Sequence, residues 1–551
     1  MGTAPRHTSW STIGRRLSAG VLAAALPLSA CTAAALAAAG PAQAAEKADS
    51  GVRADSSSLG GSDSRNRWLV DSTLNTLFDV NNAVGAPAMW VRTDAAGQRV
   101  TGKGVGVALI DSGIAPVKGL AQPGKVINGP DLSFESQAPN LAHLDTFGHG
   151  THMAGIIAGR DPEVPAGREN DPKYFVGVAP DANLVNLKVA AADGAVDVSQ
   201  IIAAIDWAVT HRNDPGLNIR VINLSFGTDS IQDPRLDPLS YAVEAAWRAG
   251  IVVVVSVGND GPTDTRVSNP AINPYVIAVG GADTAGTVLT RDDVMGQFST
   301  RGDVARHADL VAPGRSIAGL RDPGSFVDVN YPAGLVEDGT GRFFKGSGTS
   351  QAAAMVSGAV ALLLQQRPTL TPDQVKKLLT STAQPLAEAD DVAQGAGELN
   401  LRVAATAPTP YLATQAFAAA LGTGSLEGAR GSAHVADSET GVELTGEQDI
   451  MGQPWVPLTW TAASATGRAW NGGMWNGNVW AGSDWTGTSW AERTWSSQAW
   501  LARTWSGTSW QARTWSDAGW TGDGWSARTW SARTWSARTW SGQYWSATAW
   551  K

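Results

Sequence analysis

Three residue types that together can attack a carbonyl carbon occur in distant parts of the chain. Asp111 directly follows the apolar run 104–110, His149 opens a run of small residues, and Ser350 follows a glycine-rich turn. A hydroxyl needs a base to take its proton, and the base needs an acid to hold its tautomer. The oxyanion that develops needs donors already in place. This combination of residues predicts acyl transfer by a nucleophilic serine.

Each of these residues also has a plainer interpretation. Many strands end in an aspartate, so Asp111 alone indicates little. His149 is followed three positions later by His152, and two imidazoles at that spacing could bind a metal or simply lie in the core. No acidic third ligand follows in a zinc-like pattern, so no metal site is expected. Ser350 is equally consistent with an ordinary helix N-cap.

The donors for an oxyanion are predicted from two places in the chain. Ser350 precedes a long apolar run that ends near Gln366, so it is expected at a helix N-terminus. There its own N–H has no partner within the helix, and the helix dipole favours negative charge. Asn259 follows the β-branched run 251–257, and its side-chain amide can supply the second donor. An asparagine in an ordinary turn would give the same pattern.

These residues need a scaffold that brings distant segments together, and the apolar pattern predicts one. Short β-branched runs alternate with helical patterns, which is typical of an α/β fold: a parallel sheet with helices on both faces. The expected strands are 104–110, 184–189, 219–224, 251–257 and 275–279. Helices are expected over 198–210 and after Thr371, which forms a capping box with Gln374. In such sheets functional groups lie at the carboxyl ends of strands.

Four segments in this order resemble the subtilase family, the subtilisin-like serine peptidases. They are Val-Ala-Leu-Ile-Asp-Ser-Gly around Asp111, His-Gly-Thr-His-Met-Ala-Gly from His149, Gly-Asn-Asp-Gly around Asn259 and Gly-Thr-Ser-Gln-Ala around Ser350. The resemblance covers residues 82–405. It implies a subtilisin-like fold and a serine endopeptidase that forms an acyl-enzyme intermediate. It also implies Asp111, His149 and Ser350 as the catalytic triad and Asn259 in the oxyanion hole.

The resemblance further implies where a substrate binds. Ser225, Phe226 and Gly227 resemble the edge segment along which a peptide lies as an added strand. Gln351 stands where family members often have methionine, which leaves the chemistry intact. The loop 160–175 does not resemble the usual calcium loop, yet it contains four acids. No cofactor is expected to be required, and calcium at this loop stays an open alternative.

The first 44 residues have the composition of an export signal. A positive start precedes the charge-free run 17–39, and Ala42-Gln43-Ala44 reads as a small-residue cleavage site. These features predict a secreted protein, extracellular or associated with the cell wall, although an uncleaved membrane anchor gives a similar pattern. The lone Cys31 lies inside this signal, so the mature chain has neither a thiolate metal site nor a cysteine nucleophile.

Net charge argues against nucleic acid as a partner. The chain carries −9 at pH 7, and loss of a signal with three arginines and no acid makes the remainder more negative. No other segment is long and apolar enough for a membrane span, so none is expected in the mature chain. Polypeptide substrates are the partners that the resemblance to subtilases implies.

The rest of the chain divides into segments of different composition. A polar linker or short pro-segment is expected over 45–81, the peptidase domain over 82–405 and a linker over 406–454. In 455–551 tryptophan occupies every fifth position except at Ala465, which accounts for 19 of the 24 Trp. A five-residue period would spiral around a helix and alternate faces on a flat strand. A chain that bends once per pentad satisfies the period, so a β-solenoid-like repeat is expected.

Two roles are open for these indoles, and two interpretations for the whole chain. The tryptophans either form the core of the repeat or expose faces that bind a polymer. The repeat carries seven arginines and Lys551 against four acids, which suits an anionic cell-wall polymer. The alternative to a working enzyme is an inactive subtilase body that serves as a cell-wall binding or scaffolding protein. That alternative predicts a lost triad or oxyanion residue, and none is lost.

Overall fold

The computed structural model describes residues 75–137, 141–435 and 443–480. Every described residue belongs to one compact unit, which lies within Asp63–Lys551. The export signal predicted for 1–44 and the pentads after Trp480 lie outside the described residues. Within the described part, no helix combines the length and the apolar character that crossing a bilayer demands.

The central feature is an eight-stranded sheet that is parallel except for one edge strand. In spatial order its strands are β3 (Val126–Asn128), β4 (Asn183–Lys188), β2 (Gly106–Asp111), β5 (Ile219–Leu224), β6 (Val252–Ser256), β7 (Ile277–Asp283) and the antiparallel β8 (Val294–Met295), and β9 (Leu310–Pro313) also pairs with β7. The strands β2, β6, β7 and β9 are buried at every residue, as expected for a sheet covered on both faces. The predicted α/β architecture is confirmed.

The strand boundaries follow the β-branched runs, with one instructive difference. The expected strand 219–224 has the bounds of β5. The strand expected over 275–279 instead begins at Ile277 and continues to Asp283. It passes through Gly280 and Gly281, which weaken a strand read in isolation, because β9 pairs with β7 at these positions. Pairing with a distant segment therefore sets this boundary.

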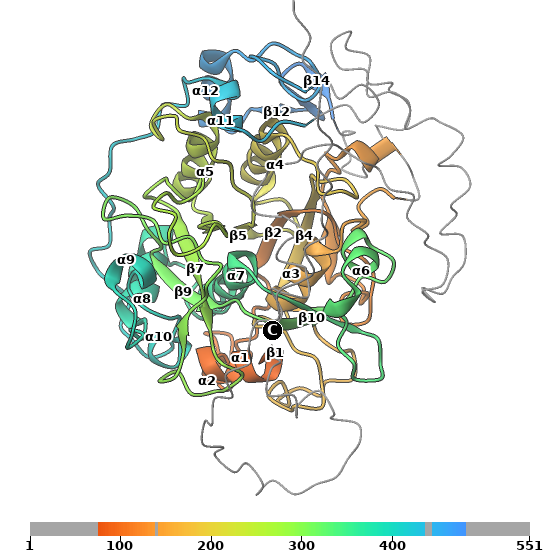
Figure 1. The fold of residues 1–551 in the computed structure, drawn as a ribbon, viewed down its shortest axis with the longest axis vertical. Helices are drawn as coiled ribbons and strands as arrows, with labels where there is room; N and C mark the ends of the chain where they lie inside the picture. Colours follow the sequence, from red (N-terminus) through yellow and green to blue (C-terminus); the bar gives the residue numbers. More distant parts are fainter. Residues whose placement is uncertain (1–74, 138–140, 436–442, 481–551) are drawn as a thin grey trace, which may run out of the picture. The chain divides into compact units, whose positions relative to one another are not determined.

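Four helices cover the two faces of the sheet (Figure 1). They are α3 (His149–Ala158), α4 (Val198–His211), α5 (Pro238–Arg248) and α7 (Thr349–Gln366). α3 connects β3 to β4, α4 connects β4 to β5, and α5 connects β5 to β6. α3 packs against α7, and α4 packs against α5, so the helices form two sets on opposite faces of the sheet.

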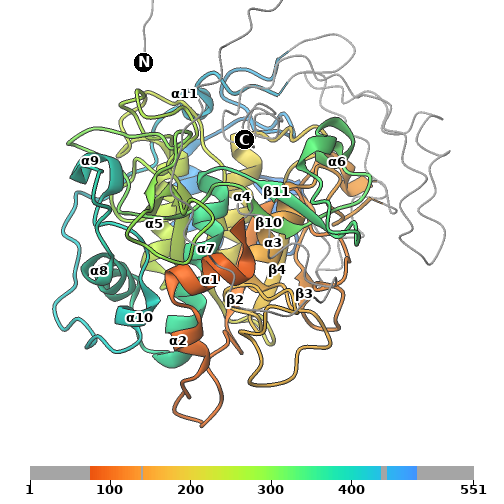
Figure 2. The same cartoon turned by 60° about the horizontal axis from the view of Figure 1, so that its bottom comes forward.

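Smaller elements complete the body around these layers. A second sheet orders β1 (Asn75–Thr76), β10 (Ile317–Leu320) and β11 (Phe343–Gly346). The short helices are α1 (Leu77–Val84), α2 (Pro87–Trp90), α6 (Phe326–Asn330), α8 (Pro372–Thr382), α9 (Asp391–Gln394) and α10 (Leu401–Ala404), with 3-10 turns η2 (Phe134–Gln137) and η3 (Pro332–Gly334). Figure 2 brings α1 and α2 forward, and α2 contacts α10. The capping box predicted at Thr371 is present at the start of α8.

The predicted domain boundaries fall within packed segments. The boundary placed after residue 81 lies inside α1, whose Leu77 and Val80 are buried. The described part of 406–454 contains α11 (Leu426–Arg430), which packs on α4 and α5. Arg430 is fully buried there and donates from Nε to Asp197 Oδ2 at 2.7 Å. Since Asp197 is the N-cap of α4, this ion pair joins the segment to the body.

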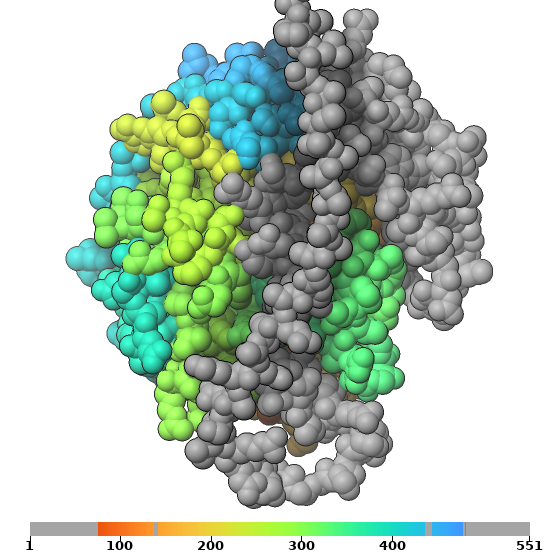
Figure 3. Space-filling view, viewed as in Figure 1, coloured from red at the N-terminus to blue at the C-terminus, as the bar shows by residue number. Residues whose placement is uncertain are grey.

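The start of the tryptophan repeat forms a further layer over α4 and α5. Its elements are α12 (Pro457–Ala465), β12 (Trp470–Asn471), β13 (Met474–Trp475) and β14 (Asn478–Val479). The three strands are antiparallel, with Trp470 opposite Trp475, so the chain reverses once per pentad here. In the space-filling view this blue segment adjoins the yellow and green surface of the body (Figure 3). The β-solenoid expected for most of the repeat concerns residues outside the described ones.

Candidate active site

A buried carboxylate and a buried imidazole meet at the carboxyl end of β2. His149, the first residue of α3, donates from Nδ1 to Asp111 Oδ1 at 2.8 Å and approaches Oδ2 at 3.0 Å. Asp111 is 1% exposed and His149 2%. The Asp111 carboxylate can only accept, so the Nδ1 atom of His149 carries the proton. The Nε2 atom is then the basic position of the ring, as a general base requires.

A second buried carboxylate, Asp145, holds this pair in place. Asp145 Oδ1 accepts from Ser112 Oγ at 2.7 Å and from Gly148 N at 2.7 Å, and Oδ2 accepts from Thr151 N at 2.7 Å. Ser112 Oγ in turn accepts from Gly150 N at 2.9 Å and lies 3.2 Å from Asp111 Oδ1. Burial raises the pKa of Asp145, and the hydrogen bonds from Thr151, Gly148 and Ser112 oppose that rise. One carboxylate thus ties the N-terminus of α3 to the residue that follows Asp111.

Sequence reasoning did not identify Asp145. Its position four residues before His149 was a usable signal, because a carboxylate just ahead of a helix can accept from first-turn N–H groups. The loop that contains Asp145 is fixed by a further buried pair, Lys188 Nζ and Glu135 Oε2 at 2.6 Å, both with fully buried side chains. Breaking such a pair leaves one charge buried and unpaired, which is strongly destabilising.

Ser350 lies in the first turn of α7, which is the helix N-terminus predicted from the sequence. Its side chain is 2% exposed, and its Oγ makes no hydrogen bond to any residue that the structure describes. Asn259 lies next to it: Asn259 Oδ1 accepts from Thr349 N at 2.8 Å and from Thr349 Oγ1 at 3.0 Å. These contacts fix the Asn259 amide beside the start of α7. The structure therefore brings Asn259 and Ser350 together, while α7 packs against the helix that begins with His149.

His152 does not act as a metal ligand with His149. Its Nε2 lies 3.0 Å from Phe344 O and 3.2 Å from Ile317 O, so this nitrogen is a donor to main-chain carbonyls. Burial and, secondarily, the neighbouring His149 lower the pKa of His152 to about 4. His152 is therefore neutral at physiological pH and belongs to the core. Within 75–137, 141–435 and 443–480, no group of three potential metal-ligating side chains is present.

The segment expected to bind substrate follows β5 directly. Ser225 and Phe226 are buried, and the Phe226 ring belongs to the hydrophobic core. The Phe226 side chain is therefore not available to a peptide. At Gly227 a Cβ atom would lie 2.4 Å from Ser268 Oγ, so glycine is required for the close approach of these two segments.

The four acids of the loop 160–175 are each committed to a basic side chain. The pairs are Asp161–Arg342, Glu163–Lys118, Glu169–Arg99 and Asp171–Arg168. Asp161 and Glu169 are buried, whereas the Glu163 side chain is exposed. The carboxylates thus point to different cations instead of converging on one point, as a calcium ion bound by 6–8 oxygens would require.

The arrangement of these residues is typical of the serine hydrolase class. Serine hydrolases use a buried acid–imidazole pair beside a serine at a helix N-terminus, and the α/β sheet presents these groups at its carboxyl edge.

Comparison with known proteins identifies the family within that class. The family model described as the subtilase family matches residues 102–401. Serine protease AprX from Bacillus subtilis (strain 168) is 37% identical over 310 residues, which are 55% of this chain and 66% of AprX. Subtilisin DY from Bacillus licheniformis is 32% identical over 311 residues, 56% of this chain and 93% of that protein. The chain therefore belongs to the subtilase family, and it is a serine endopeptidase of that family.

A solved structure is also similar. The crystal structure of a cold adapted subtilisin-like serine proteinase has 27% sequence identity and a TM-score of 0.41, and the match covers 57% of this chain and 97% of that one. The family match ends at residue 401, before the tryptophan repeat.

Replacing Asp145 by asparagine is predicted to lower kcat/KM by roughly 10²-fold, because misplacing a catalytic group by about 1 Å costs that much. The loss falls mainly on kcat, since no substrate contact is removed. Asp131→Asn is the matched control: Asp131 is also a buried acceptor, bonded to Ser133 and His143 N, but it does not contact Asp111 or α3. Steady-state kinetics that show equal losses for both variants would contradict the positioning role.

Proposed function

We propose that this protein is an active secreted endopeptidase, with Asp111, His149 and Ser350 as its triad and Asn259 in its oxyanion hole. The buried Asp111–His149 hydrogen bond at the end of β2 carries the proposal. A carboxylate and an imidazole removed from water in this geometry give a ring whose Nε2 can accept a proton. The packing of α3 on α7, whose first turn contains Ser350, supports the same role.

In the proposed reaction Ser350 Oγ attacks the scissile carbonyl while His149 Nε2 takes its proton. Asp111 stabilises the imidazolium that forms. The oxyanion accepts hydrogen bonds from Ser350 N–H, at the positive end of the α7 dipole, and from the Asn259 amide. His149 then protonates the leaving amine, and a water molecule hydrolyses the acyl-enzyme. The peptide lies as an added strand along the main chain of 225–227.

The competing proposal is an inactive subtilase body that binds or scaffolds the cell wall. The presence of every triad and oxyanion residue supports the enzyme instead. The five described tryptophans of the repeat are at most 5% exposed, which supports a core role for them. Attachment to an anionic wall polymer and a β-solenoid fold would therefore both be properties of residues 481–551. Secretion rests on the composition of residues 1–44.

A fluorophosphonate probe is predicted to label the wild-type protein on Ser350 and to leave Ser350→Ala unlabelled. The serine must be activated by His149 to react, so the probe reports on the assembled triad. Labelling is read by gel fluorescence and located by mass spectrometry. Correctly folded and processed wild-type protein that takes up no label would favour the scaffolding alternative.

Removing the Asn259 donor is predicted to lower kcat by roughly 10²–10³ with little change in KM. Asn259→Ala also removes the oxygen that accepts from Thr349, so Asn259→Asp is the comparison. The aspartate keeps that acceptor but offers no amide donor. Both variants should lose activity if the donor matters. An Asn259→Asp enzyme that is as fast as wild type would remove Asn259 from the oxyanion hole.

We further propose that the loop 160–175 needs no calcium, because each of its acids already pairs with a basic side chain. Chelation with EGTA should leave the thermal unfolding temperature unchanged, as measured on the Ser350→Ala variant to prevent autolysis. A fall in Tm that calcium restores, and that Asp161→Asn abolishes, would show that the ion displaces Arg342 from Asp161 and would overturn this proposal.

A further inference from the structure

The described part of the repeat places one indole per pentad into a single cluster. Neighbouring rings are in contact, with centroid separations of 4.9 Å for Trp455–Trp460, 5.5 Å for Trp475–Trp480 and 6.3 Å for Trp470–Trp480. All five indoles are at most 5% exposed. The five-residue tryptophan period therefore places regularly spaced indoles against the surface of α4 and α5.

A buried aspartate on α4, Asp206, accepts hydrogen bonds from two of these indoles. Asp206 Oδ2 accepts from Trp460 Nε1 at 2.7 Å and from Trp475 Nε1 at 2.9 Å, and Oδ1 accepts from Ser464 Oγ at 2.6 Å. Trp470 Nε1 donates to Ala203 O on the same helix at 2.8 Å. Three of the five described indoles therefore combine a buried ring with an N–H that donates to an oxygen acceptor.

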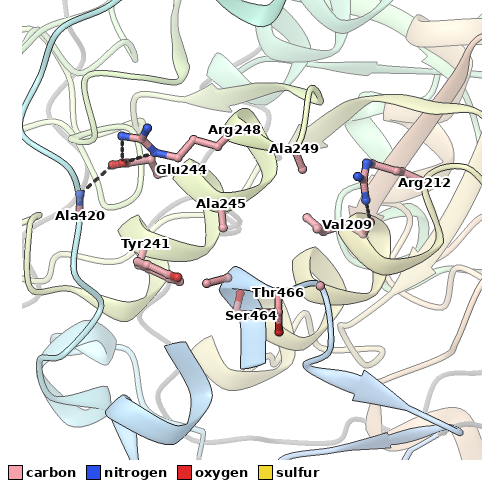
Figure 4. A pocket seen from close by; sticks show the side chains of 12 residues that line it. Val209, Arg212, Tyr241, Glu244, Ala245, Arg248, Ala249, Ala420, Ser464 and Thr466 are labelled. Atoms are coloured by element: carbon pink, nitrogen blue, oxygen red, sulfur yellow. Dashed lines mark hydrogen bonds and ion pairs between the residues drawn. The ribbon is translucent and has the colours of Figure 1, made fainter. Parts of the chain in front are cut away.

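The one break in the period coincides with a pocket. Position 465 should carry a tryptophan by its spacing but is alanine, and Ala465 is exposed. A pocket of about 360 Å³ lies beside it, between α4, α5 and the end of α12 (Figure 4). Its size lies at the lower end of the range for sites that hold small organic groups. Its lining is Val209, Arg212, Tyr241, Glu244, Ala245, Arg248, Ala249, Ala420 and the segment 464–467.

The chemistry of this pocket suits another indole. Val209, Ala245 and Ala249 provide apolar surface. In Figure 4 the guanidinium groups of Arg212 and Arg248 lie on different sides of the pocket, where either can face an aromatic ring. Arg248 already lies 5.0 Å from the centre of the Tyr275 ring, so it can stack on aromatic surfaces.

Acceptors for an indole N–H are also present, and an anion is disfavoured. Tyr241 Oη donates to Thr461 O at 3.2 Å, and its oxygen keeps lone pairs with which to accept. Glu244 neutralises Arg248 through a 2.7 Å ion pair. Val209, Ala245 and Arg248 lie in the last turns of α4 and α5, where main-chain carbonyls concentrate negative charge. A neutral aromatic donor fits this field better than a carboxylate or phosphate does.

We propose that this pocket is a receptor for an indole side chain from the pentads in residues 481–551 of the same chain. Those residues contain fourteen tryptophans at five-residue steps, most of them followed by serine or threonine. The chain continues into them from Trp480, whose indole is buried in the same cluster. The tether raises the effective concentration of these indoles above that of any free competitor. The site is independent of the proposed catalytic residues.

The test uses the full chain carrying Ser350→Ala, so that it cannot cleave itself. A photoreactive diazirine amino acid replaces Thr466, an exposed residue on the rim of the pocket. After irradiation, mass spectrometry identifies the captured peptides. We expect tryptophan-containing peptides from 481–551, and we expect no heavy–light pairs when isotopically heavy and light chains are mixed.

Restoring the period provides the decisive variant. Ala465→Trp should fill the pocket with its own indole and reduce capture of the tail by about tenfold or more, which corresponds to about 1.4 kcal/mol. Ala462→Trp is the matched control, because it adds an indole at an exposed position of α12 outside the pocket lining. This control should leave capture unchanged.

Several outcomes would overturn the proposal. If the diazirine reacts only with solvent, or captures only peptides outside 481–551, the tail does not occupy the pocket. Heavy–light pairs would identify a second copy of the chain as the source of the indole. Equal capture in Ala465→Trp and in the control would show that the tail lies near Thr466 without entering the pocket.

Discussion

The cost of burying the Asp111 carboxylate is the constraint on which the rest of this molecule depends. A carboxylate at 1% exposure is stable only if its oxygens are hydrogen-bonded, and here the His149 ring and Ser112 N provide those bonds. The helix that carries His149 must therefore approach β2 closely. At Gly150 a Cβ atom would lie 2.1 Å from Gly113 O, so only glycine permits this approach. The small residues around the site follow from this one requirement.

The same requirement explains three further buried charges. Asp145, Asp206 and Arg430 each join two segments that are distant in sequence, and each makes at least three hydrogen bonds. Such networks are stable only when every member is satisfied, which makes them specific for a single arrangement of the chain. In this protein they hold α3 to β2, the start of the repeat to α4, and the segment 426–430 to the N-cap of α4.

The two faces of the sheet have separate tasks. The face with α3 and α7 carries His149 and Ser350, whereas the face with α4 and α5 supports the C-terminal segment. Figure 1 shows α11, α12 and β12 gathered beside α4 and α5, away from α3. The sheet separates these two sets of helices. The described start of the repeat is therefore anchored away from the proposed catalytic residues.

Local pattern alone determined much of this protein. The β-branched runs identified five of the eight strands of the central sheet, with β5 having the expected bounds, and the capping box at Thr371 marked the start of α8. Positions at strand and helix ends made Asp111, His149, Asn259 and Ser350 candidates, and the resemblance to the subtilase family implied their roles. These signals are readable because propensity, periodicity and capping depend on neighbouring residues.

Only the tertiary structure decided the features that depend on which distant segments meet. β7 extends through two glycines because β9 pairs with it, Asp145 gains its role from the contact between α3 and β2, and Phe226 is buried by the core. The pentad period did not reveal helix α12 or the acceptor Asp206, since a period specifies spacing and not the surface against which the indoles pack. Burial of a polar or aromatic group is a property of the assembled chain, and for this reason no local pattern encodes it.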